Sequence, residues 1–524
     1  MPNYSINATG ATLTKLRTPD SFTTISGMCT TCLDGCVGPC EIGRSALRAA
    51  EMIYPQPFGQ VTAASQKRYP VDLSDFNIMG SAVGAYGIEA DSDKALFTMV
   101  DLTTAIGRDK GIKCRLPLSI PGLGSTDVAR NNWDGLAIGA ALAGVPLTVG
   151  ENVCGMDVQS KIEQGKVVES PDLRRRVELY KKWQRDGFGR IIVQSNVEDT
   201  RLGVFEYAIR KLNVGVVELK WGQGAKNIGG EVKIDDLDKA QLLHQRGYIV
   251  LPDPTDPNVI DAFKRGTFRE FERHSRLGMV DQSEFVEAVA RLRDMGAAHV
   301  CLKTGAYRPA DLARAVKCAS LAKIDLLTID GAGGGTGMSP WRMMNEWGIP
   351  TVELISLARQ YCDRLAKRGE YVPDVAVAGG FILEDQVLKG LALGAPFAKL
   401  VGMARSPIAA CMVGKTVGKM IEEGNLPGTI SRYGTTRDEV FVTAPELRQM
   451  LNGRYDELPC SAIGLYTYFA RLAQGLRQFM CGGRKFALEH ITRDDICALT
   501  REAADVSGIR YVMEIDKEEV ETIL

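Results

Sequence analysis

The sequence has few histidines, no long apolar run and no excess of charge of either sign. Its 524 residues include four histidines, and none stands at metal-ligand spacing from another, so we do not expect a metal site built from imidazoles. No apolar run approaches the ~20 residues that span a bilayer. The net charge of −1 argues against nucleic acid as the main partner.

The N-terminus also lacks a targeting signal. It has no basic stretch followed by an apolar one, and we therefore expect a cytoplasmic protein. Nine of the thirteen cysteines are scattered, mostly through apolar patterns, as small core residues are in a reducing compartment. The length allows one large barrel with appendages, or about two to three domains.

The other four cysteines form a cluster: Cys29, Cys32, Cys36 and Cys40. Glycine and proline lie between them, which prevents a regular helix and lets the chain wrap around a point. The run resembles the cluster loops of anaerobic carbon monoxide dehydrogenases and ferredoxins. A single compact run favours a [4Fe–4S] cluster, while a zinc site and cysteines without a metal are the alternatives.

The most informative stretch is a glycine-rich loop in the second half of the chain. A largely apolar run, Ile324–Ile329, ends at Asp330 and is followed by five glycines within residues 331–337. This pattern predicts a buried parallel strand whose loop lets bare backbone approach a ligand. Val375–Gly380 and Pro396–Gly402 repeat the pattern. In α/β barrels, the loops after the last strands commonly hold a phosphate.

Between residues 113 and 425 we therefore predict an α/β fold, a (β/α)8 TIM barrel, because eight short apolar segments alternate with helical patterns. The expected strands are Leu116–Ile120, Pro146–Val149, Arg190–Gln194, Val216–Lys220, Ala298–Lys303, Leu326–Asp330, Asp374–Ala378 and Phe397–Val401. The expected helices include Asn132–Ala143, Arg174–Arg185, Gln282–Met295, Pro309–Ala322 and Leu383–Ala392.

Three segments flank or interrupt this barrel. Residues 1–70 form an N-terminal extension with the cysteine cluster, and 71–112 a connecting segment with a helical stretch near Asp91–Ile106. Residues 221–281 are too long for one crossover, and we expect this insertion at the catalytic mouth.

Residues 426–524 predict a helical C-terminal region. Its expected helices are Ala444–Leu451, Ala462–Arg477 and Arg493–Asp505. Aromatic side chains in the second of these, Tyr466, Tyr468 and Phe469, suggest a self-contact and hence a homo-oligomer.

From Leu116 to about Gly418 the chain resembles the FMN-binding domain of the glutamate synthase family. The motifs that carry the resemblance, in order, are Leu116-Pro-Leu-Ser-Ile-Pro-Gly-Leu-Gly-Ser125, Leu219-Lys-Trp-Gly-Gln-Gly-Ala-Lys226, Asp330-Gly-Ala-Gly-Gly-Gly-Thr-Gly-Met-Ser-Pro340 and the last two strands. The second is similar to the family's Lys-x-x-Gln-Gly-Ala-Lys loop at the 2-oxoglutarate site, and the third to its Gly-Gly-Thr-Gly-Ala-Ser-Pro signature. Together, in this order, they are specific.

The resemblance implies FMN and a set of binding residues. Backbone amides of glycine loops suit a flavin phosphate, and Lys303 suits the anionic reduced flavin. Ser119 and Gln194, which stand at the ends of strands, are expected to donate hydrogen bonds to the flavin ring. The expected cofactor-binding residues are Ser119, Gln194, Lys303, Gly333, Gly334, Gly335, Gly379, Gly380, Gly402 and Met403.

We expect the substrate to meet four polar side chains. Lys220 and Lys226 are expected to bind a carboxylate or polarise a C=O or C=N carbon, Glu231 to donate a proton, and Gln223 belongs to the same loop. A solvated loop lysine is the alternative for each lysine.

The sequence departs from the glutamate synthase pattern in three places. Cys411 stands alone where the family has three cysteines for a [3Fe–4S] cluster, so that cluster cannot form, and the N-terminal cysteines are expected to replace it. Because the sequence begins Met-Pro-Asn, we expect no glutaminase domain with an N-terminal cysteine nucleophile. Finally, Lys226-Asn-Ile-Gly-Gly-Glu231 is one residue shorter than the family's loop and places an acid where an amide contacts the keto acid, which disfavours a dicarboxylate and favours an amine.

These observations leave three functional hypotheses. The first is an anaerobic FMN and iron–sulfur oxidoreductase that reduces an imine or keto-acid-type substrate with electrons from ferredoxin or a partner protein. The second is an amine-exchange subunit resembling N-methylglutamate synthase. The third is a non-catalytic scaffold subunit, which would purify colourless.

Overall fold

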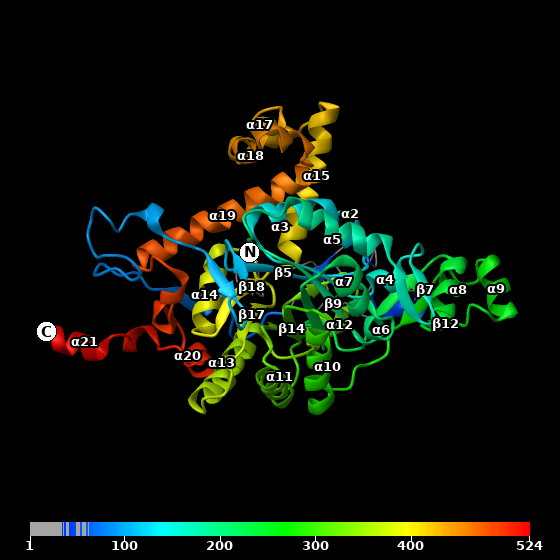
Figure 1. Cartoon of the computed structure of the whole chain (residues 1–524), viewed down its shortest axis with the longest axis horizontal. Coiled ribbons are helices and arrows are strands. Elements are labelled where there is room, and N and C mark those ends of the chain that lie inside the picture. The colour runs from blue at the N-terminus through cyan, green and yellow to red at the C-terminus, as the bar shows by residue number, and fades with distance from the viewer. Residues whose placement is uncertain are drawn as a thin grey trace.

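The computed structural model describes residues 34, 36, 37, 41–48, 53, 54, 59, 60, 62–65 and 67–524. Its centre is a closed barrel of parallel strands in the order β10-β14-β15-β17-β18-β5-β6-β9 (Figure 1). These strands are β5 (Leu118–Leu123), β6 (Leu147–Val149), β9 (Ile191–Ser195), β10 (Val216–Lys220), β14 (His299–Thr304), β15 (Leu326–Asp330), β17 (Asp374–Ala378) and β18 (Ala398–Gly402). Each overlaps one of the eight expected segments, so the predicted barrel is confirmed.

Helices surround the barrel because each presents one apolar face to the strands. They are α3 (Trp133–Ala143), α5 (Pro171–Trp183), α7 (Val204–Leu212), α10 (Gln282–Asp294), α11 (Pro309–Leu321), α13 (Thr351–Lys367), α14 (Glu384–Gly394) and α15 (Arg405–Glu423). Short helices α2 (Asp127–Asn131), α4 (Val153–Met156), α6 (Val197–Arg201) and α12 (Trp341–Glu346) lie in the loops. The five helices expected from periodicity are among them.

The inside of the barrel alternates between an apolar and a polar layer, because alternate residues of a strand point to the same side. The apolar layer is a cluster of buried side chains that includes Ile192, Val216, Cys301, Leu326, Ala376 and Leu400. Two residues further along three of these strands lie the buried polar residues Gln194, Glu218 and Lys303. The polar layer therefore faces the carboxyl ends of the strands.

A β-hairpin closes the other end of the barrel. It consists of β3 (Thr104–Ile106) and β4 (Ile112–Cys114), and its Ile106, Ile112 and Cys114 pack against the apolar layer. The prediction of a helix near Asp91–Ile106 is wrong, because a 3-10 turn, Phe97–Met99, and β3 occupy the second half of this stretch. Burial of the hairpin under the barrel outweighs the helical pattern.

The insertion expected at residues 221–281 is a small separate unit. It contains β11 (Glu231–Ile234), α8 (Leu237–Gln245), β12 (Ile249–Leu251), α9 (Pro257–Lys264) and β13 (Phe271–His274), with an antiparallel sheet in the order β11-β13-β12. Figure 1 shows α8, α9 and β12 to one side of the barrel, near the hairpin of β7 (Lys161–Glu163) and β8 (Lys166–Glu169).

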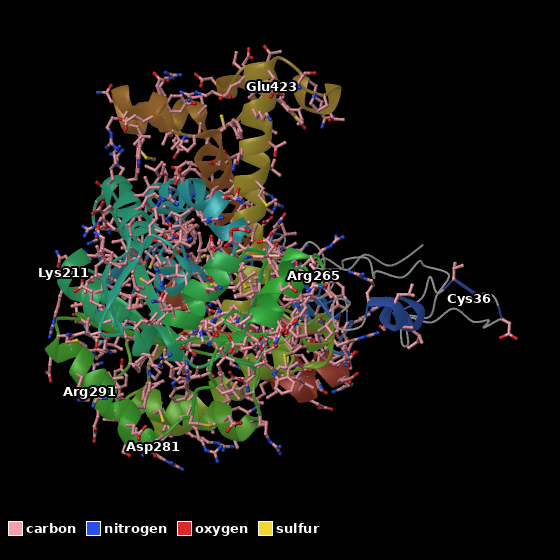
Figure 2. All side chains as sticks on the ribbon, turned by 90° about the vertical axis from the view of Figure 1, so that its right-hand side faces the viewer. Cys36, Lys211, Arg265, Asp281, Arg291 and Glu423 are labelled. Atoms are coloured by element: carbon pink, nitrogen blue, oxygen red, sulfur yellow. The ribbon has the colours of Figure 1, made fainter. Side chains whose placement is uncertain are left out.

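The C-terminal region covers a second side of the barrel. The chain leaves along α15, turns through α16 (Gly428–Ser431), α17 (Arg437–Val440) and α18 (Ala444–Leu451), and returns along α19 (Cys460–Gly482). α17 and α18 form a projection beyond the barrel (Figure 1), and Glu423 marks its far end in Figure 2. α19 packs against both α15 and α3.

Two expectations about this region are corrected. Arg493–Asp505 is not one helix, because a 3-10 turn and β19 (Ile496–Ala498) precede α20 (Arg501–Ser507); β19 is buried and pairs with β2 (Phe76–Ile78). The aromatic residues of α19 are not exposed: Phe469 is buried, and the hydroxyls of Tyr466 and Tyr468 bond to Glu446 and the Ile382 carbonyl. The last helix is α21 (Lys517–Ile523).

No helix among the residues described above is long and apolar enough to cross a membrane.

Candidate functional site

A cavity of about 130 Å³ opens at the carboxyl ends of the barrel strands. Its wall consists of the loops after β5, β6, β15, β17 and β18, together with β11 and β13 of the inserted sheet. Small-molecule sites of barrels occur at this end. The insertion therefore lies at the mouth, as expected.

One end of the cavity offers unused amides and a cation. Gly379 and Gly380 adopt φ of +132° and +97°, which glycine alone adopts without strain. In the described part of the chain their amides donate to no acceptor. Helix α15 begins at this point, and Ala404 and Arg405 line the cavity. The half-buried Arg405 has no ion-pair partner among the described residues, and burial lowers its pKa. Such an end suits an anion.

Seven of the ten expected cofactor-binding residues line the cavity, and three do not. The residues that line the cavity are Lys303, Gly334, Gly335, Gly379, Gly380, Gly402 and Met403. The Met403 amide is already used, because it donates to the Ser119 carbonyl at 2.9 Å. Ser119, Gln194 and Gly333 do not line the cavity.

Gln194 lies below the cavity floor. Its amide donates to Oε1 of Glu218 at 2.6 Å, and a Cβ added to Gly122 would meet its Oε1 at 2.5 Å. Gly122 therefore separates Gln194 from the cavity and must lack a side chain to sit there.

Lys303 stands in the middle of the cavity wall with its charge fixed by two acids. It is buried, and its Nζ lies 3.1 Å from Oδ2 of Asp330. Burial by itself lowers the Lys303 pKa, but Asp330 and Glu218 outweigh it, so the pKa rises above its ordinary value. Lys303 therefore carries a positive charge at neutral pH.

The expected substrate lysines share a buried acid that the sequence analysis missed. Lys220 forms an ion pair with Glu151 and donates to Oε1 of Gln223 at 2.9 Å. Burial raises the Glu151 pKa, but Lys220 and Lys226 overcome this and hold it at about 2. Lys226 donates to the Met338 carbonyl, and burial together with Lys220 lowers its pKa to about 8.

Lys226 and Gln223 also line a second, adjoining cavity. Lys220 lines this second cavity but not the main one. The two lysines therefore separate the main cavity from a neighbouring chamber.

The second missed residue is Arg273, a buried guanidinium on β13. It is 0% exposed and lines the cavity. Nη1 donates to Oγ of Ser275 at 2.5 Å, and Cζ lies 4.8 Å from the ring centroid of Tyr248. Nε and Nη2 have no hydrogen-bond partner within the described residues. These two donors form the side of the guanidinium that binds a carboxylate bidentately.

Glu231 faces the cavity from β11 with one oxygen unpaired. Its Oε2 is buried and has no hydrogen-bond partner in the described part of the chain, while Oε1 lies 3.3 Å from Nδ1 of His274. Burial raises the Glu231 pKa against the lowering effect of His274. An acid in this state holds a proton or a cation.

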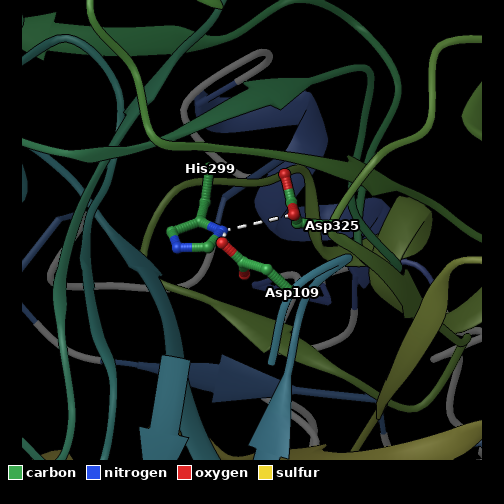
Figure 3. A group of neighbouring side chains, drawn as sticks. All are labelled: Asp109, His299 and Asp325. Carbon is green, nitrogen blue, oxygen red and sulfur yellow. Dashed lines mark hydrogen bonds and ion pairs between the residues drawn. The ribbon is translucent and has the colours of Figure 1, made fainter. Parts of the chain in front are cut away.

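A different polar group lies at the closed end of the barrel, where Asp109, His299 and Asp325 are grouped (Figure 3). Nδ1 of His299 is 3.2 Å from Oδ1 of Asp325. The same carboxylate accepts from the amides of Arg108 and Val300 and from Nε of Arg108. Its oxygens are thus occupied by donors, and the group joins the hairpin loop to the barrel rather than offering a cation site.

The expected metal-ligating cysteines are not tested by the structure. Cys29, Cys32 and Cys40 lie outside the described residues. Cys36 is exposed, and Figure 2 shows it away from the barrel. Cys411, which stands alone in the sequence, is buried in α15.

Comparison with known proteins agrees with this geometry. Residues 273–415, from β13 through the first half of α15, match the conserved region in glutamate synthase. This part of the barrel is glutamate synthase-like. The match begins at Arg273 and includes Lys303, the glycine loops after β15, β17 and β18, and Arg405. The expected family resemblance is confirmed for this region.

A curated relative extends the glutamate synthase likeness. The glutamate synthase large subunit-like protein YerD of Bacillus subtilis is 27% identical over 237 residues, which are 45% of this chain and 39% of YerD. The match thus spans about two fifths of that relative's length.

Two solved structures show distant likeness in shape. Flavocytochrome b2 with pyruvate bound has a TM-score of 0.45 at 11% identity, covering 86% of this chain and 82% of its own. Lactate oxidase of Pediococcus acidilactici has a TM-score of 0.42 at 14% identity, with 79% and 81% covered.

Proposed function

We propose that this chain is an FMN-dependent oxidoreductase of glutamate synthase type that reduces an imine or keto-acid-type substrate. Electrons would come from ferredoxin or another partner protein through a [4Fe–4S] cluster on Cys29, Cys32, Cys36 and Cys40. The observation that carries the proposal is a cavity with anion donors at both ends, the amides of Gly379 and Gly380 at one and Arg273 at the other.

The residues of the first end fit the phosphate of FMN. Unused glycine amides and the first turn of a 19-residue helix converge on one point, and Arg405 adds a positive charge without a competing acid. Phosphates bind in such places because the amide donors and the helix dipole act together. A tight loop also excludes water from the phosphate.

The middle of the cavity fits the flavin ring. Lys303 keeps its charge beside the glycine loop 333–335, and a fixed positive charge stabilises an anionic reduced flavin. When bound, FMN would supply the hydride chemistry. Lys303 contributes by holding a positive charge at the ring, and Asp330 keeps the ammonium oriented.

The far end fits the carboxylate of an organic acid. Arg273 lines the cavity and has two buried, unpaired parallel donors, Nε and Nη2, and Lys226 carries a further charge in the wall. Glu151 holds the ammonium of Lys220 in place, which orients that lysine toward the boundary between the two cavities. Binding one carboxylate there would hold the adjacent C=N or C=O carbon in a fixed orientation.

A second candidate function is amine exchange, as in a subunit resembling N-methylglutamate synthase. The buried, unpaired Oε2 of Glu231 favours it, because a carboxylate oxygen without a donor would accept an ammonium group. The difference is measurable: steady consumption of reduced ferredoxin or dye supports reduction, and amine exchange without net electron uptake supports the alternative.

The test begins with flavin binding. The purified chain, reconstituted with FMN, should bind one flavin, and Gly380→Val should lose it because Val strains a backbone held at φ +97°. Arg405→Ala should weaken FMN about tenfold or more while leaving riboflavin, which has no phosphate, unaffected. Arg368→Ala, an exposed arginine elsewhere, is the control. A colourless chain that binds neither flavin would overturn the proposal in favour of a scaffold subunit.

A second measurement tests the acid end. Arg273→Lys keeps the charge but removes the two parallel donors. We therefore expect KM for the carboxylate substrate to rise about tenfold or more at unchanged flavin content. Unchanged KM would place the carboxylate elsewhere. The electron donor, the cluster, a cytoplasmic location and self-association stay predictions.

A further inference from the structure

The inserted sheet carries a row of ionisable side chains that starts in the cavity. Glu231 of β11 lies directly opposite His274 of β13, and Lys233 lies opposite Glu272. All four share one face of the sheet, because residues two apart on a strand point the same way. Nδ1 of His274 is 3.3 Å from Oε1 of Glu231, and its Nε2 is 3.3 Å from Oε2 of Glu272. One imidazole thus bridges two carboxylates.

The two ends of this row differ in their surroundings. Glu231 is one of the residues that line the cavity, and its unpaired Oε2 is buried. Glu272 is the most exposed of the three, at 34% of its side chain against 26% for His274 and 22% for Glu231. Glu272 also holds the Lys233 ammonium. The row therefore leads from the cavity toward solvent.

We propose that His274 is a proton shuttle that re-protonates Glu231 from solvent by way of Glu272. The inference rests on the proposed reduction and on the role expected for Glu231 from the sequence, which is to give a proton to the substrate as it is reduced. One proton leaves the Glu231 carboxyl for the substrate, and the imidazole gives its Nδ1 proton to Oε1 of the resulting carboxylate. Nε2 then takes a proton that Glu272 has picked up from water. The imidazole now carries its proton on Nε2, and rotation of the ring and of the Glu231 carboxyl restores the starting arrangement, so that the net proton comes from solvent.

The charges along the row support this direction of transfer. Burial raises the Glu231 pKa, whereas the Glu272 pKa is lowered because Lys233 and His274 outweigh its burial. Glu231 therefore keeps its proton at a pH at which Glu272 has lost its own. Glu231 and Glu272 are the charged groups that contact His274 in the described structure, and Lys233 forms an ion pair with Glu272.

The geometry differs from that of a static ion-pair network. Nε2 of His274 makes no aligned hydrogen bond in the described structure although Glu272 is within 3.3 Å. A small ring rotation would align it, and a shuttle requires such freedom at one nitrogen. A purely stabilising pair would leave no buried carboxylate oxygen unpaired.

The first test does not depend on flavin or turnover. The chain has only four histidines, so the imidazole NMR signals can be assigned by deleting them one at a time, His274→Asn identifying the signal of interest. In Glu231→Gln, we expect the Nδ1 signal of His274 to change, because the carboxylate oxygen 3.3 Å away is replaced by an amide group. The signals of His244, an exposed histidine of the same unit beside Asp253, should not move. An unchanged Nδ1 signal of His274 would overturn the shuttle.

The second test uses dye-linked turnover of the FMN-loaded protein. His274→Asn should lower kcat about ten- to a hundredfold with KM unchanged, increase the solvent isotope effect, and recover activity on addition of imidazole. His244→Asn should match the unaltered chain. A purely structural role for His274 would give no rescue by imidazole and no change in isotope effect, and this outcome would overturn the shuttle too.

The two tests separate the shuttle from the proposed function. If the unaltered chain neither binds flavin nor turns over, the proposed function fails, and the NMR coupling alone decides whether the three groups exchange protons. If turnover is normal in His274→Asn, the function stands and the shuttle fails.

Discussion

At the scale of single residues, this protein uses burial to set charge. Lys303 and Glu151 are largely removed from water, and each keeps its charge because oppositely charged groups lie nearby. Burial without such groups would have neutralised them. The cavity therefore has a fixed pattern of charge before any ligand arrives, which reduces the reorganisation that binding requires.

Asp325 gives the clearest stability prediction. Burial raises its pKa, but the hydrogen bond from His299 and the Arg108 and Val300 amides outweigh it and hold the value at about 2, below the ordinary 3.8. A lowered pKa contributes stability above the unfolded value, and this contribution is lost as pH falls from about 5 toward 2. Asp325→Asn should therefore cost about 2 kcal/mol at neutral pH.

The measurement is urea unfolding of both proteins at several pH values. The stability difference should shrink as the pH falls through this window. Asp127→Asn, which breaks an exposed pair with Arg130, should cost less than about 0.5 kcal/mol. A difference for Asp325→Asn that persists unchanged at pH 2 would contradict the electrostatic explanation.

Residues of the site were predictable where they follow a strand. Lys220, Lys303 and the glycines after β17 and β18 were found because the carboxyl ends of parallel strands meet at one rim. The same rule applies to Glu151, two residues after β6, and to Arg405, three after β18, but neither belongs to a recognisable motif. Arg273 gives no such signal, since its strand lies outside the barrel repeat and a single arginine is ordinarily exposed.

At the scale of elements, strands were predicted better than their surroundings. Each barrel strand is buried on both sides, so its apolar run is short and clearly bounded. The hairpin of β3 and β4 and the strand β19 were missed because their structure depends on distant partners, the barrel end and β2. Local periodicity contains no information about such pairing.

One element joins the start of the chain to the site. β1 (Ala63–Ala64) pairs with β16 (Gly335–Thr336) in the glycine loop after β15, and a Cβ on Gly335 would lie 2.2 Å from the Ala63 carbonyl. Gly335→Ala should therefore displace β1. We expect hydrogen exchange at residues 63–64 to accelerate about tenfold or more and FMN to bind more weakly.

The control for this change is Gly80→Ala, where the added Cβ would meet its nearest atom at an ordinary 3.6 Å. Unaltered exchange at residues 63–64 in Gly335→Ala would show that the loop can move aside without releasing β1.

At the scale of the whole molecule, glycines join the C-terminal region to the barrel. Gly139 of α3 faces Leu465, and Gly414 and Gly418 of α15 face Cys460. Helices approach closely where one of them lacks side chains, which increases their packing area. The returning helix α19 thereby fastens the projection of α17 and α18 to the barrel wall.

Gly414→Val tests this attachment. Its Cβ would lie 2.4 Å from the Cys460 carbonyl, a backbone atom that cannot rotate away. We expect a loss of about 1–3 kcal/mol in unfolding free energy and faster exchange in α19. Gly428→Val, with no atom within 4 Å of the added Cβ, should have a small effect. Equal stability of the two variants would mean that α19 contributes little to the fold.

The inserted sheet has a consequence for how selectivity can change. The glycine loops after β15, β17 and β18 belong to the barrel's own repeat, whereas Arg273, Glu231 and His274 lie in an insertion between β10 and β14. Under the proposed function, exchanging that insertion would alter which acid or amine is accepted and how fast it receives protons, while the loops proposed to hold FMN stay as they are. We therefore expect substrate range among such proteins to differ mainly through changes in this one insertion.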